Sequence, residues 1–323
     1  MSFNEVIEML GDDWRRVKIL MSEYLHTDVS LLRDTNDSVL GHSGKMMRPM
    51  VSLLNAAAIG KVNDDSLRLA AASEILHNAS LMHDDVADGS LERRGFPSVM
   101  SLHGPSAAIL IGDFWLAKAV EAVFDSECQE NVKWLFSKTL SDLSEGEMLQ
   151  LEKSFTADTS EEDYLKIIYC KTASLFNVAC TSGAVSVRAD NAMKDAASSY
   201  GVALGLAFQI KDDILDYSGT SEMGKPVGVD IREKKITLPL LGAFRNAPEK
   251  EAEIRAMIRD MKDPCRTGSE ITSYVLDNGG IEYASSVLDS YVRKAEESIS
   301  VYADSPAKEA LVSLARFNAI RQV

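Results

Sequence analysis

Two short acidic motifs with the same spacing stand out among the residues that could do chemistry. Both read DDxxD, with aspartates at Asp84, Asp85 and Asp88 and again at Asp212, Asp213 and Asp216. In a helix, residues four apart lie on one face, so the first and last aspartate of each motif point the same way. Like charges at this spacing repel, and the helix dipole disfavours anions near a C-terminal end. A sequence that carries such a pair twice therefore indicates a compensating cation.

Carboxylate oxygens suit Mg²⁺, a hard cation that keeps several waters and is commonly shared with substrate phosphates. One such motif alone is as readily a solvated helix end. An EF-hand is a poor interpretation, because Asp84–Gly89 lacks alternating ligands and a terminal glutamate. Two motifs, each after a long apolar helical run, favour a shared metal site in which they face one another and hold ions that bridge a diphosphate. The candidate metal ligands are Asp84, Asp88, Asp212 and Asp216.

Basic residues follow or precede both acidic motifs. They are Lys45 and Arg48 in GKMMRP, Arg93 and Arg94 after the first motif, Lys171 before Thr172, and Lys225 and Lys235 after the second motif. Each alone would be read as an ordinary surface charge. Together they could hold diphosphate, because arginine offers a planar fork to phosphate oxygens and lysine a compact point charge.

The elements that must position these residues are helices. Apolar residues recur at three- and four-residue steps over 67–88, 195–217 and 272–303, and no convincing alternating strand competes. Turn signals separate the helical stretches, as at 41–44, 104–105 and 278–280. Without a linker or low-complexity segment, the chain is expected to form a single domain, residues 1–323. The predicted fold class is all-α, a single large helical bundle around a central cavity.

Composition excludes several classes of function. The net charge of −15 over 323 residues argues against a general affinity for nucleic acid. Four cysteines without a CxxC pair indicate free thiols in a reducing compartment. The N-terminus lacks the features of a signal peptide, and no apolar run is long enough to span a bilayer. We therefore expect a cytoplasmic protein without a transmembrane segment.

Seven segments in a fixed order resemble the trans-isoprenyl diphosphate synthases, or polyprenyl synthetases. They are GKMMRP (44–49), HNASLMHDDVADGSLERRG (77–95), GDFWLAKA (112–119), EGEMLQ (145–150), KTASLF (171–176), FQIKDDILDY (208–217) and GKPVGVDIREKKITLPL (224–240). The resemblance runs from about Lys45 to the C-terminus. It implies the isoprenoid synthase fold, a Mg²⁺ requirement, and condensation of isopentenyl diphosphate with an allylic prenyl diphosphate.

The resemblance also assigns roles to individual residues. Isopentenyl diphosphate would bind Lys45, Arg48, His77 and Arg94. The allylic diphosphate would bind Arg93, Lys171, Thr172, Gln209, Lys225 and Lys235. Catalysis would rest on Asp84, Asp85, Asp88, Lys171, Asp212 and Lys225. Two positions depart from the family pattern: Met46 replaces an arginine, and Lys234 replaces a glycine.

Small residues before the first motif bear on product length. In the family, small side chains one turn before that motif accompany long products and large aromatics short ones, and here the positions are Ala79 and Ser80. We expect an octaprenyl-like, long-chain enzyme that makes a quinone side-chain precursor. The alternatives are a shorter-chain synthase and a terpene cyclase, although a cyclase normally carries an Asn/Asp, Ser/Thr, Glu triad in place of the second DDxxD. The resemblance further implies a homodimer, and an oily product implies transient membrane contact.

Overall fold

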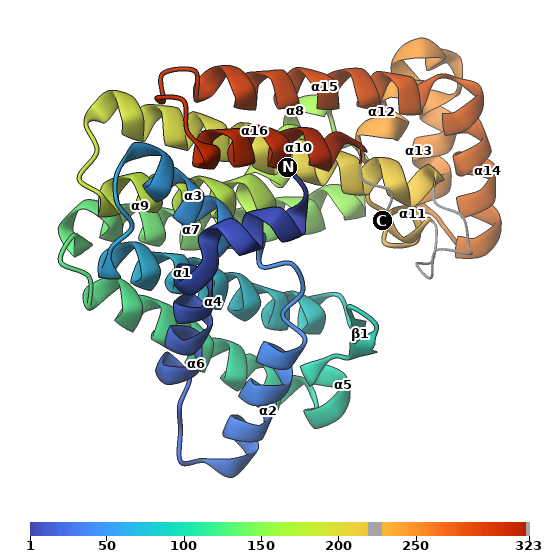
Figure 1. The fold of residues 1–323 in the computed structure, drawn as a ribbon. Coiled ribbons are helices and arrows are strands. Elements are labelled where there is room, and N and C mark those ends of the chain that lie inside the picture. Colours follow the sequence, from blue (N-terminus) through green and yellow to red (C-terminus); the bar gives the residue numbers. More distant parts are fainter. Residues whose placement is uncertain (219–227, 321–323) are drawn as a thin grey trace. The chain divides into compact units, whose positions relative to one another are not determined.

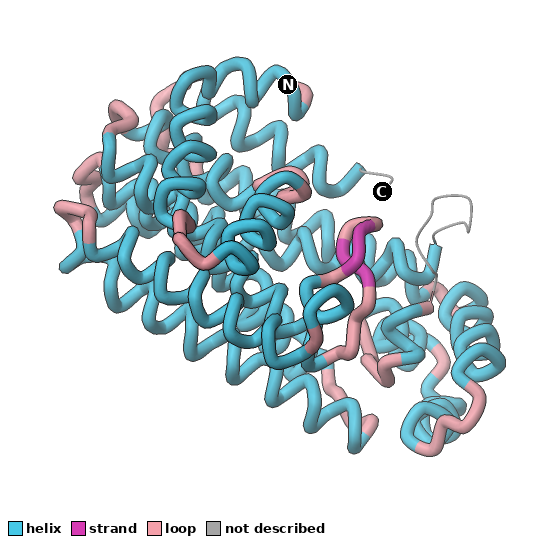
Figure 2. Tube along the Cα trace, turned by 90° about the horizontal axis from the view of Figure 1, so that it is seen from below, coloured by secondary structure: helices cyan, strands magenta, loops and turns pink. Residues whose placement is uncertain are grey.

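The structure is a computed structural model that describes residues 1–218 and 228–320, and it is helical almost throughout (Figure 2). The first half contains α1 (Phe3–Tyr24), α2 (Ser30–Gly41), α3 (Met47–Ile59), α4 (Asp64–Ala87), β1 (Glu92–Arg93), β2 (Phe96–Pro97), α5 (Val99–His103), α6 (Pro105–Phe124) and α7 (Gln129–Thr156). The second half contains α8 (Glu161–Ile168), the π-helical turn η1 (Tyr169–Ala173), α9 (Ser174–Ser186), α10 (Asn191–Ser218), α11 (Val229–Arg232), α12 (Leu238–Asn246), the 3₁₀ turn η3 (Pro248–Lys250), α13 (Glu251–Arg259), α14 (Pro264–Asp277), α15 (Gly280–Ser298) and α16 (Pro306–Ile320). The prediction of an all-α fold is confirmed.

The chain forms two compact units. The first comprises Met1–Lys138, Leu175–Ser198 and Ile299–Leu311. The second comprises Thr139–Ser174, Ser199–Ser298 and the described part of Val312–Val323. The first aspartate motif belongs to the first unit and the second motif to the second unit.

Helix α4 is the centre of the first unit (Figure 1). It contacts α1, α3 and α6, and α6 lies along it most extensively. All residues from Leu69 to Ala79 are buried, because α4 is covered on every side. The helix begins where Asn63 caps it: the Asn63 side chain accepts a hydrogen bond from the amide of Ser66 at 3.0 Å. Fixed at that end, α4 carries the first aspartate motif on its last turn.

A short hairpin follows α4 and was not predicted. Its two-residue strands β1 and β2 pair antiparallel, with Arg93 opposite Phe96. Arg94 and Gly95 make the turn with φ of 55° and 80°. A strand of two residues is too short to show an alternating pattern of apolar residues, so the sequence could not predict this hairpin. The hairpin turns the chain back after Asp88 and brings Arg93 to α4.

Helix α10 carries the second motif, and the turn η1 connects α8 to α9. The period that predicted helix over 272–303 is divided in the structure between α14 and α15, with Gly279 at φ 68° in the turn between them. Within the second unit, helix α12 packs against both α14 and α15.

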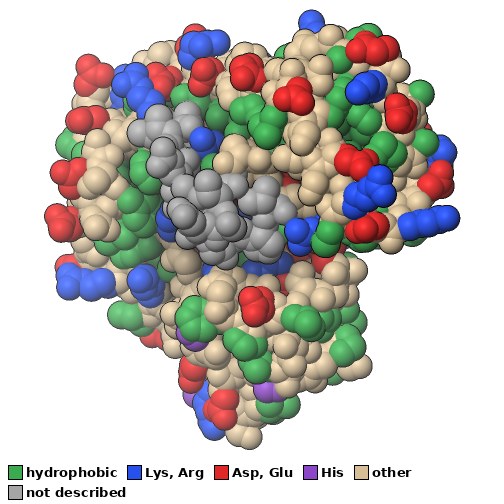
Figure 3. All heavy atoms as spheres, turned by 90° about the vertical axis from the view of Figure 1, so that its right-hand side faces the viewer, with side chains coloured by type: hydrophobic (Ala, Val, Ile, Leu, Met, Phe, Trp, Pro, Cys, Tyr) green, Lys and Arg blue, Asp and Glu red, His purple; other side chains and the backbone are tan. Residues whose placement is uncertain are grey.

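No helix within residues 1–218 and 228–320 is both long and apolar enough to cross a bilayer. On the face drawn in Figure 3, lysine and arginine side chains are scattered among aspartate and glutamate rather than gathered into one broad field.

Candidate active site

Within the first aspartate motif, the middle residue Asp85 is buried, whereas Asp84 and Asp88 are more exposed. Asp84 is half-buried and Asp88 exposed at the end of α4, and the amide of Asp88 donates to the carbonyl of Asp84 at 2.8 Å, so both remain in helical register. Asp85 is buried, and the Arg93 Nε–H donates to its Oδ1 at 2.9 Å. Burial raises the pKa of the Asp85 carboxyl, and the Arg93 guanidinium opposes that rise. Asp85 therefore holds Arg93, while Asp84 and Asp88 share the face predicted for a metal.

The cations predicted for isopentenyl diphosphate surround one stretch of α4. Arg48, in the first turn of α3, is buried with its guanidinium 4.8 Å from the ring centre of Phe176. His77 is buried, and its pKa lies well below the ordinary value, first because of burial and then because Arg48, Arg94 and Arg93 repel a proton. The imidazole is therefore neutral at pH 7. No residue that the structure describes is hydrogen-bonded to its buried Nδ1, which suits an atom that receives a ligand.

Two loops place the remaining members of this set. Lys45 is exposed directly before α3, and Met46 has a left-handed φ of 48° and is buried. Arg94 donates from Nη1 to the carbonyl of His42 at 3.2 Å, which ties the hairpin to the loop before α3. The structure thus brings together the arginines and His77 that the resemblance grouped, within the first unit.

Glu74 is a buried carboxyl that sequence reasoning missed. It lies three residues before His77 on α4 and is 1% exposed. Burial raises its pKa, and the charges of Arg48 and Arg94 lower it. A glutamate inside an apolar helical run was the available signal, because such a residue is rarely buried without cations nearby.

The second motif also has a buried middle residue. Asp213 is 4% exposed and accepts hydrogen bonds from Tyr164 Oη at 2.6 Å and from Gln209 Nε2 at 2.8 Å. Burial raises its pKa to about 7, although both hydrogen bonds oppose the rise. Asp212 and Asp216 are half-buried, on the side of α10 predicted to hold metal.

Asp216 has a structural role that the motif did not reveal. Its two carboxylate oxygens accept from the amides of Val229 and Asp230, each at 3.1 Å, at the start of α11. Asp230 adds another carboxyl whose charge interacts with those of Asp213 and Asp216. This contact could not be predicted, because it joins residues that are 13 and 14 positions apart in the sequence.

The turn η1 positions two of the predicted phosphate-binding residues. Lys171 forms an ion pair with Glu147 of α7, and Thr172 Oγ1 donates to Gln209 Oε1 at 2.8 Å. Helix α7 approaches the turn closely at Gly146, where an added Cβ would lie 2.6 Å from Cys170 Cβ. π-Helical turns are frequent at functional sites, since they re-aim side chains within a helix.

Two further lysines, Lys225 and Lys235, were predicted to bind the allylic diphosphate. Lys235 is half-buried and forms an ion pair with Glu233. Lys234, at the family's glycine position, has a left-handed φ of 60°. Lys225 lies outside the described residues.

The predicted chain-length residues lie on α4, on the stretch that follows His77. Ala79 is buried, and Ser80 is half-buried with its hydroxyl donating to the carbonyl of His77 at 2.8 Å. Their role in product length stays a prediction.

The donor set suits a hard divalent cation. Within the described ranges, no group of three or more His, Cys, Asp or Glu side chains is gathered to hold a metal by itself. Each motif instead offers two carboxylates at the end of one helix face. Mg²⁺ is normally bound by one or two carboxylates, with waters and phosphate oxygens as its other ligands. The motifs therefore fit Mg²⁺ held together with a phosphorylated substrate.

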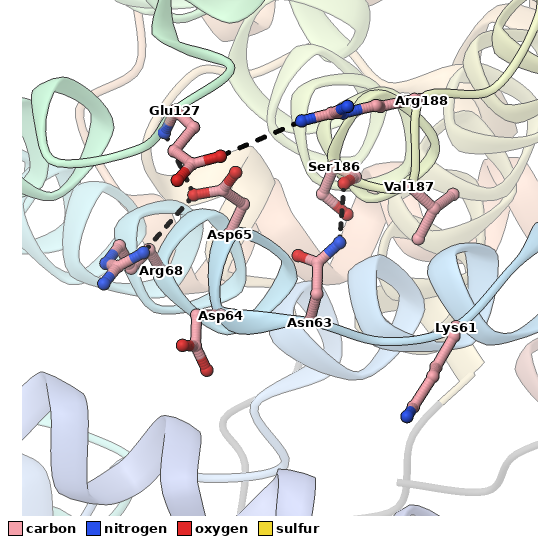
Figure 4. Close-up of a pocket in the computed structure, with 9 residues that line it drawn as sticks. All are labelled: Lys61, Asn63, Asp64, Asp65, Arg68, Glu127, Ser186, Val187 and Arg188. Atoms are coloured by element: carbon pink, nitrogen blue, oxygen red, sulfur yellow. Dashed lines mark hydrogen bonds and ion pairs between the residues drawn. The ribbon is translucent and has the colours of Figure 1, made fainter.

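A cavity of about 560 Å³ lies at the opposite end of α4 from the motif (Figure 4). Several of its charged side chains are partnered within the first unit: Asp65 accepts from Arg68 at 3.3 Å and from the amide of Glu127 at 3.1 Å, and Glu127 lies 3.8 Å from Arg188. These contacts fasten the start of α4 to the ends of α6 and α9. We assign the cavity a structural role.

Comparison with known proteins agrees with this geometry. The chain is 34% identical to an octaprenyl diphosphate synthase of Haemophilus influenzae, over 98% of this chain and 96% of that protein. It is 37% identical to a short chain isoprenyl diphosphate synthase of Methanothermobacter thermautotrophicus, over 90% of each. A solved polyprenyl synthase of Caulobacter crescentus, complexed with calcium and isoprenyl diphosphate, superposes with a TM-score of 0.91 at 33% identity, covering 100% of this chain and 98% of that one. The polyprenyl synthetase family model matches residues 29–273, a range that includes both aspartate motifs and every predicted phosphate-binding residue, and the chain belongs to that family.

Proposed function

We propose that this prenyltransferase joins isopentenyl diphosphate to an allylic prenyl diphosphate and so lengthens a trans-polyprenyl diphosphate. One observation carries the proposal. A single helix, α4, places the neutral His77 among Arg48, Arg93 and Arg94 and, two turns later, presents Asp84 and Asp88 together. One diphosphate can be bound directly by the cations and another through metal at the carboxylates.

Mg²⁺ would be held by Asp84 and Asp88 and by Asp212 and Asp216. When bound, it neutralises negative charge on the leaving diphosphate, which is Lewis-acid chemistry. Asp85 and Asp213 have other partners: Asp85 holds Arg93, and Asp213 is hydrogen-bonded to Tyr164 and Gln209.

The protein's own residues bind, orient and shield the substrates. Lys45, Arg48, His77 and Arg94 hold isopentenyl diphosphate, and Arg93, Lys171, Thr172, Gln209, Lys225 and Lys235 hold the allylic diphosphate. As the allylic C–O bond breaks, the lysines and arginines stabilise the departing diphosphate. The bound double bond then meets the allylic cation, so positioning supplies much of the catalysis. The released diphosphate accepts the proton lost from the new carbon chain, and apolar helical walls exclude the water that would quench the cation.

The proposed product is long, of the octaprenyl type that serves as a quinone side-chain precursor. The small side chains of Ala79 and Ser80 support it, as do relatives named octaprenyl diphosphate synthase. A shorter product is the second candidate, favoured by the 37% identity to a short chain synthase.

A product assay tests the reaction. The purified protein is incubated with Mg²⁺, isopentenyl diphosphate and allylic primers of increasing length, and extracted prenyl alcohols are separated by chromatography. We expect elongation only when both substrates are present, and Asp84→Asn or Asp212→Asn should slow it by about 10²–10³, the usual effect of removing one electrostatic stabiliser. Turnover of the allylic diphosphate alone would instead indicate a cyclase.

Product length has its own test. Ala79→Phe and Ser80→Phe should shorten the product, because a ring would fill space one turn before the motif. Ser80→Ala, which keeps the position small, is the matched control and should leave the product length as in the wild type. Unchanged products in both phenylalanine variants contradict the assignment.

We also propose that the protein is a cytoplasmic homodimer that contacts membranes only transiently, when its hydrophobic product is released. Helix α6 supports the dimer with a line of exposed apolar side chains at Leu110, Ala117, Val120 and Phe124, of which Leu110 is 68% and Phe124 55% exposed. Their spacings of seven, three and four residues place them on one face. A second copy is a suitable cover, because a two-fold interface pairs one surface with itself.

A further inference from the structure

The lysine of the π-helical turn is held by helix α7, and the residues that hold it belong with it to the second unit. Lys171 Nζ forms an ion pair with Glu147 Oε2, and the two side chains are only 20% and 17% exposed. The stem of Lys171 passes beside Gly146, where an added Cβ would lie 3.0 Å from Lys171 Cγ. Gln150 Nε2 donates to the other oxygen of Glu147 at 3.4 Å. Helix α7 therefore fixes both the stem and the charged end of this lysine.

The carboxylate of Glu147 competes with any phosphate that Lys171 binds. An ammonium group is a compact point charge, and here Glu147 already neutralises it. A phosphate oxygen that approaches the same ammonium either breaks this pair or comes to lie beside a second anion. Because both side chains are mostly shielded from water, solvent screens these charges weakly and either event is costly. Glu147 therefore lowers the affinity of Lys171 for an anion.

The proposed reaction requires such a limit on affinity at the allylic diphosphate. When the allylic C–O bond breaks and the new C–C bond forms, the old diphosphate group stays behind as inorganic diphosphate. The lengthened chain keeps the diphosphate that came from isopentenyl diphosphate. Inorganic diphosphate must therefore leave Lys171 before the lengthened chain can bind there for the next addition. Cations that held it too tightly would slow every further round.

We propose that Glu147 is a positioning residue that exchanges with diphosphate for Lys171, taking back the ammonium after each addition and so speeding the release of inorganic diphosphate. The inference rests on the proposed function, in which Lys171 holds the allylic diphosphate. Between additions, Glu147 and Gly146 keep the lysine in one place, so its side chain need not be ordered again when the next substrate binds.

Calorimetry with inorganic diphosphate and Mg²⁺ tests this competition. Glu147→Gln keeps the shape of the side chain and removes its charge, so inorganic diphosphate should bind about tenfold more tightly, the scale of one charge-assisted hydrogen bond. Glu147→Ala removes the same charge and should shift the affinity in the same direction, so the result does not depend on one variant. Lys171→Met should bind inorganic diphosphate more weakly, because the ammonium is lost. If Glu147 served the fold alone, its variants would misplace Lys171 and weaken binding instead.

Kinetics supply a second measurement. In Glu147→Gln, inorganic diphosphate should inhibit elongation at about tenfold lower concentration, and the KM for the allylic substrate should fall. The steady-state kcat should decrease more than the rate of a single addition measured with excess enzyme, because release of inorganic diphosphate becomes limiting.

Asp163→Asn is the matched control. Asp163 lies 3.0 Å from Nζ of Lys153, another lysine of α7, and the two side chains are 26% and 17% exposed. The variant removes the same charge from a similarly shielded pair of the second unit, and it should leave the affinity for inorganic diphosphate as in the wild type. Urea unfolding shows whether each variant is folded.

Three results overturn the proposal: weaker or unchanged diphosphate binding in the folded Glu147 variants, the same tightening in Asp163→Asn, or unchanged binding in Lys171→Met. A wild type that binds inorganic diphosphate but makes no prenyl product overturns the proposed function alone, since the affinities still test the exchange.

Discussion

At the scale of single residues, the buried His77 makes the free energy of unfolding depend on pH. Its pKa is well below 6.5 in the folded protein because of burial and the charges of Arg48, Arg94 and Arg93. The unfolded chain therefore binds more protons just below pH 6.5, so the free energy of unfolding must fall as the pH falls through that value. Relative to His77→Gln, the wild type should lose up to about 1.4 kcal/mol per pH unit below pH 6.5.

Urea denaturation of both proteins at pH 7.5, 6.5 and 5.5 measures this difference. Glu74 is one turn away, and burial raises the pKa of its carboxyl, so its titration also contributes to the pH dependence of stability. Repeating the series in a Glu74→Gln background separates the two titrations. A wild-type-to-variant difference that stays constant across this pH range contradicts a neutral, buried His77.

Lys234 gives a second prediction at this scale. Its φ of 60° is left-handed, a conformation that costs a residue with a Cβ roughly 1–2 kcal/mol and glycine little. Lys234→Gly should raise the free energy of unfolding by about 0.5–1 kcal/mol, even though Lys234 Nζ donates to the Arg259 carbonyl at 2.8 Å. Lys234→Ala loses the same hydrogen bond but keeps the strain, so it should bring no gain. If the two variants unfold at the same urea concentration, the backbone is not strained there.

At the scale of elements, Gly146 sets the distance between α7 and η1. An added Cβ would lie 2.6 Å from Cys170 Cβ and 3.0 Å from Lys171 Cγ. Gly146→Ala should therefore lower the free energy of unfolding by about 1–3 kcal/mol, as overpacking does. It should also lower kcat, because Lys171 and Thr172 move with the turn.

Gly268 in α14 provides the matched comparison. Nothing lies within 4 Å of a Cβ added there, and Gly268 is also inside a helix. Gly268→Ala should be neutral or stabilising by about 0.4–1 kcal/mol, since alanine loses less entropy on folding. Equal effects of the two alanines on urea unfolding would mean that helix propensity, rather than the contact with η1, decides both.

The helices and turns also show which parts of the fold could be predicted from the sequence. The period of the apolar residues predicted α4 and α10, because a buried helix must repeat its apolar side chains every three or four positions. The spacing of the aspartates predicted which carboxylates share a face. The π-turn at Lys171, the hairpin that returns Arg93 to Asp85, and the donor Tyr164 could not be predicted. Each depends on a tertiary contact or on left-handed turn residues, and neither produces a periodic pattern in the sequence.

At the scale of the whole molecule, the exposed apolar face of α6 leads to a prediction about dimer formation. Leu110 and Phe124 lie fourteen residues apart, four helical turns on one face, and both are more than half exposed. In a two-fold interface each substituted side chain is brought near its own copy. Lysines introduced at both positions would be buried as like charges, so Leu110→Lys/Phe124→Lys should weaken association by at least about 100-fold, or about 2.7 kcal/mol.

Analytical ultracentrifugation at micromolar concentration should report the mass of two chains for the wild type and of one chain for the double variant. Leu276→Lys is the control, because Leu276 is 51% exposed on α14, a helix of the second unit, and its variant should remain dimeric. Circular dichroism of the double variant should keep the helical signal, since both side chains already face solvent in the single chain. A wild type with the mass of one chain, or a double variant that still associates, means that the second copy docks elsewhere or not at all.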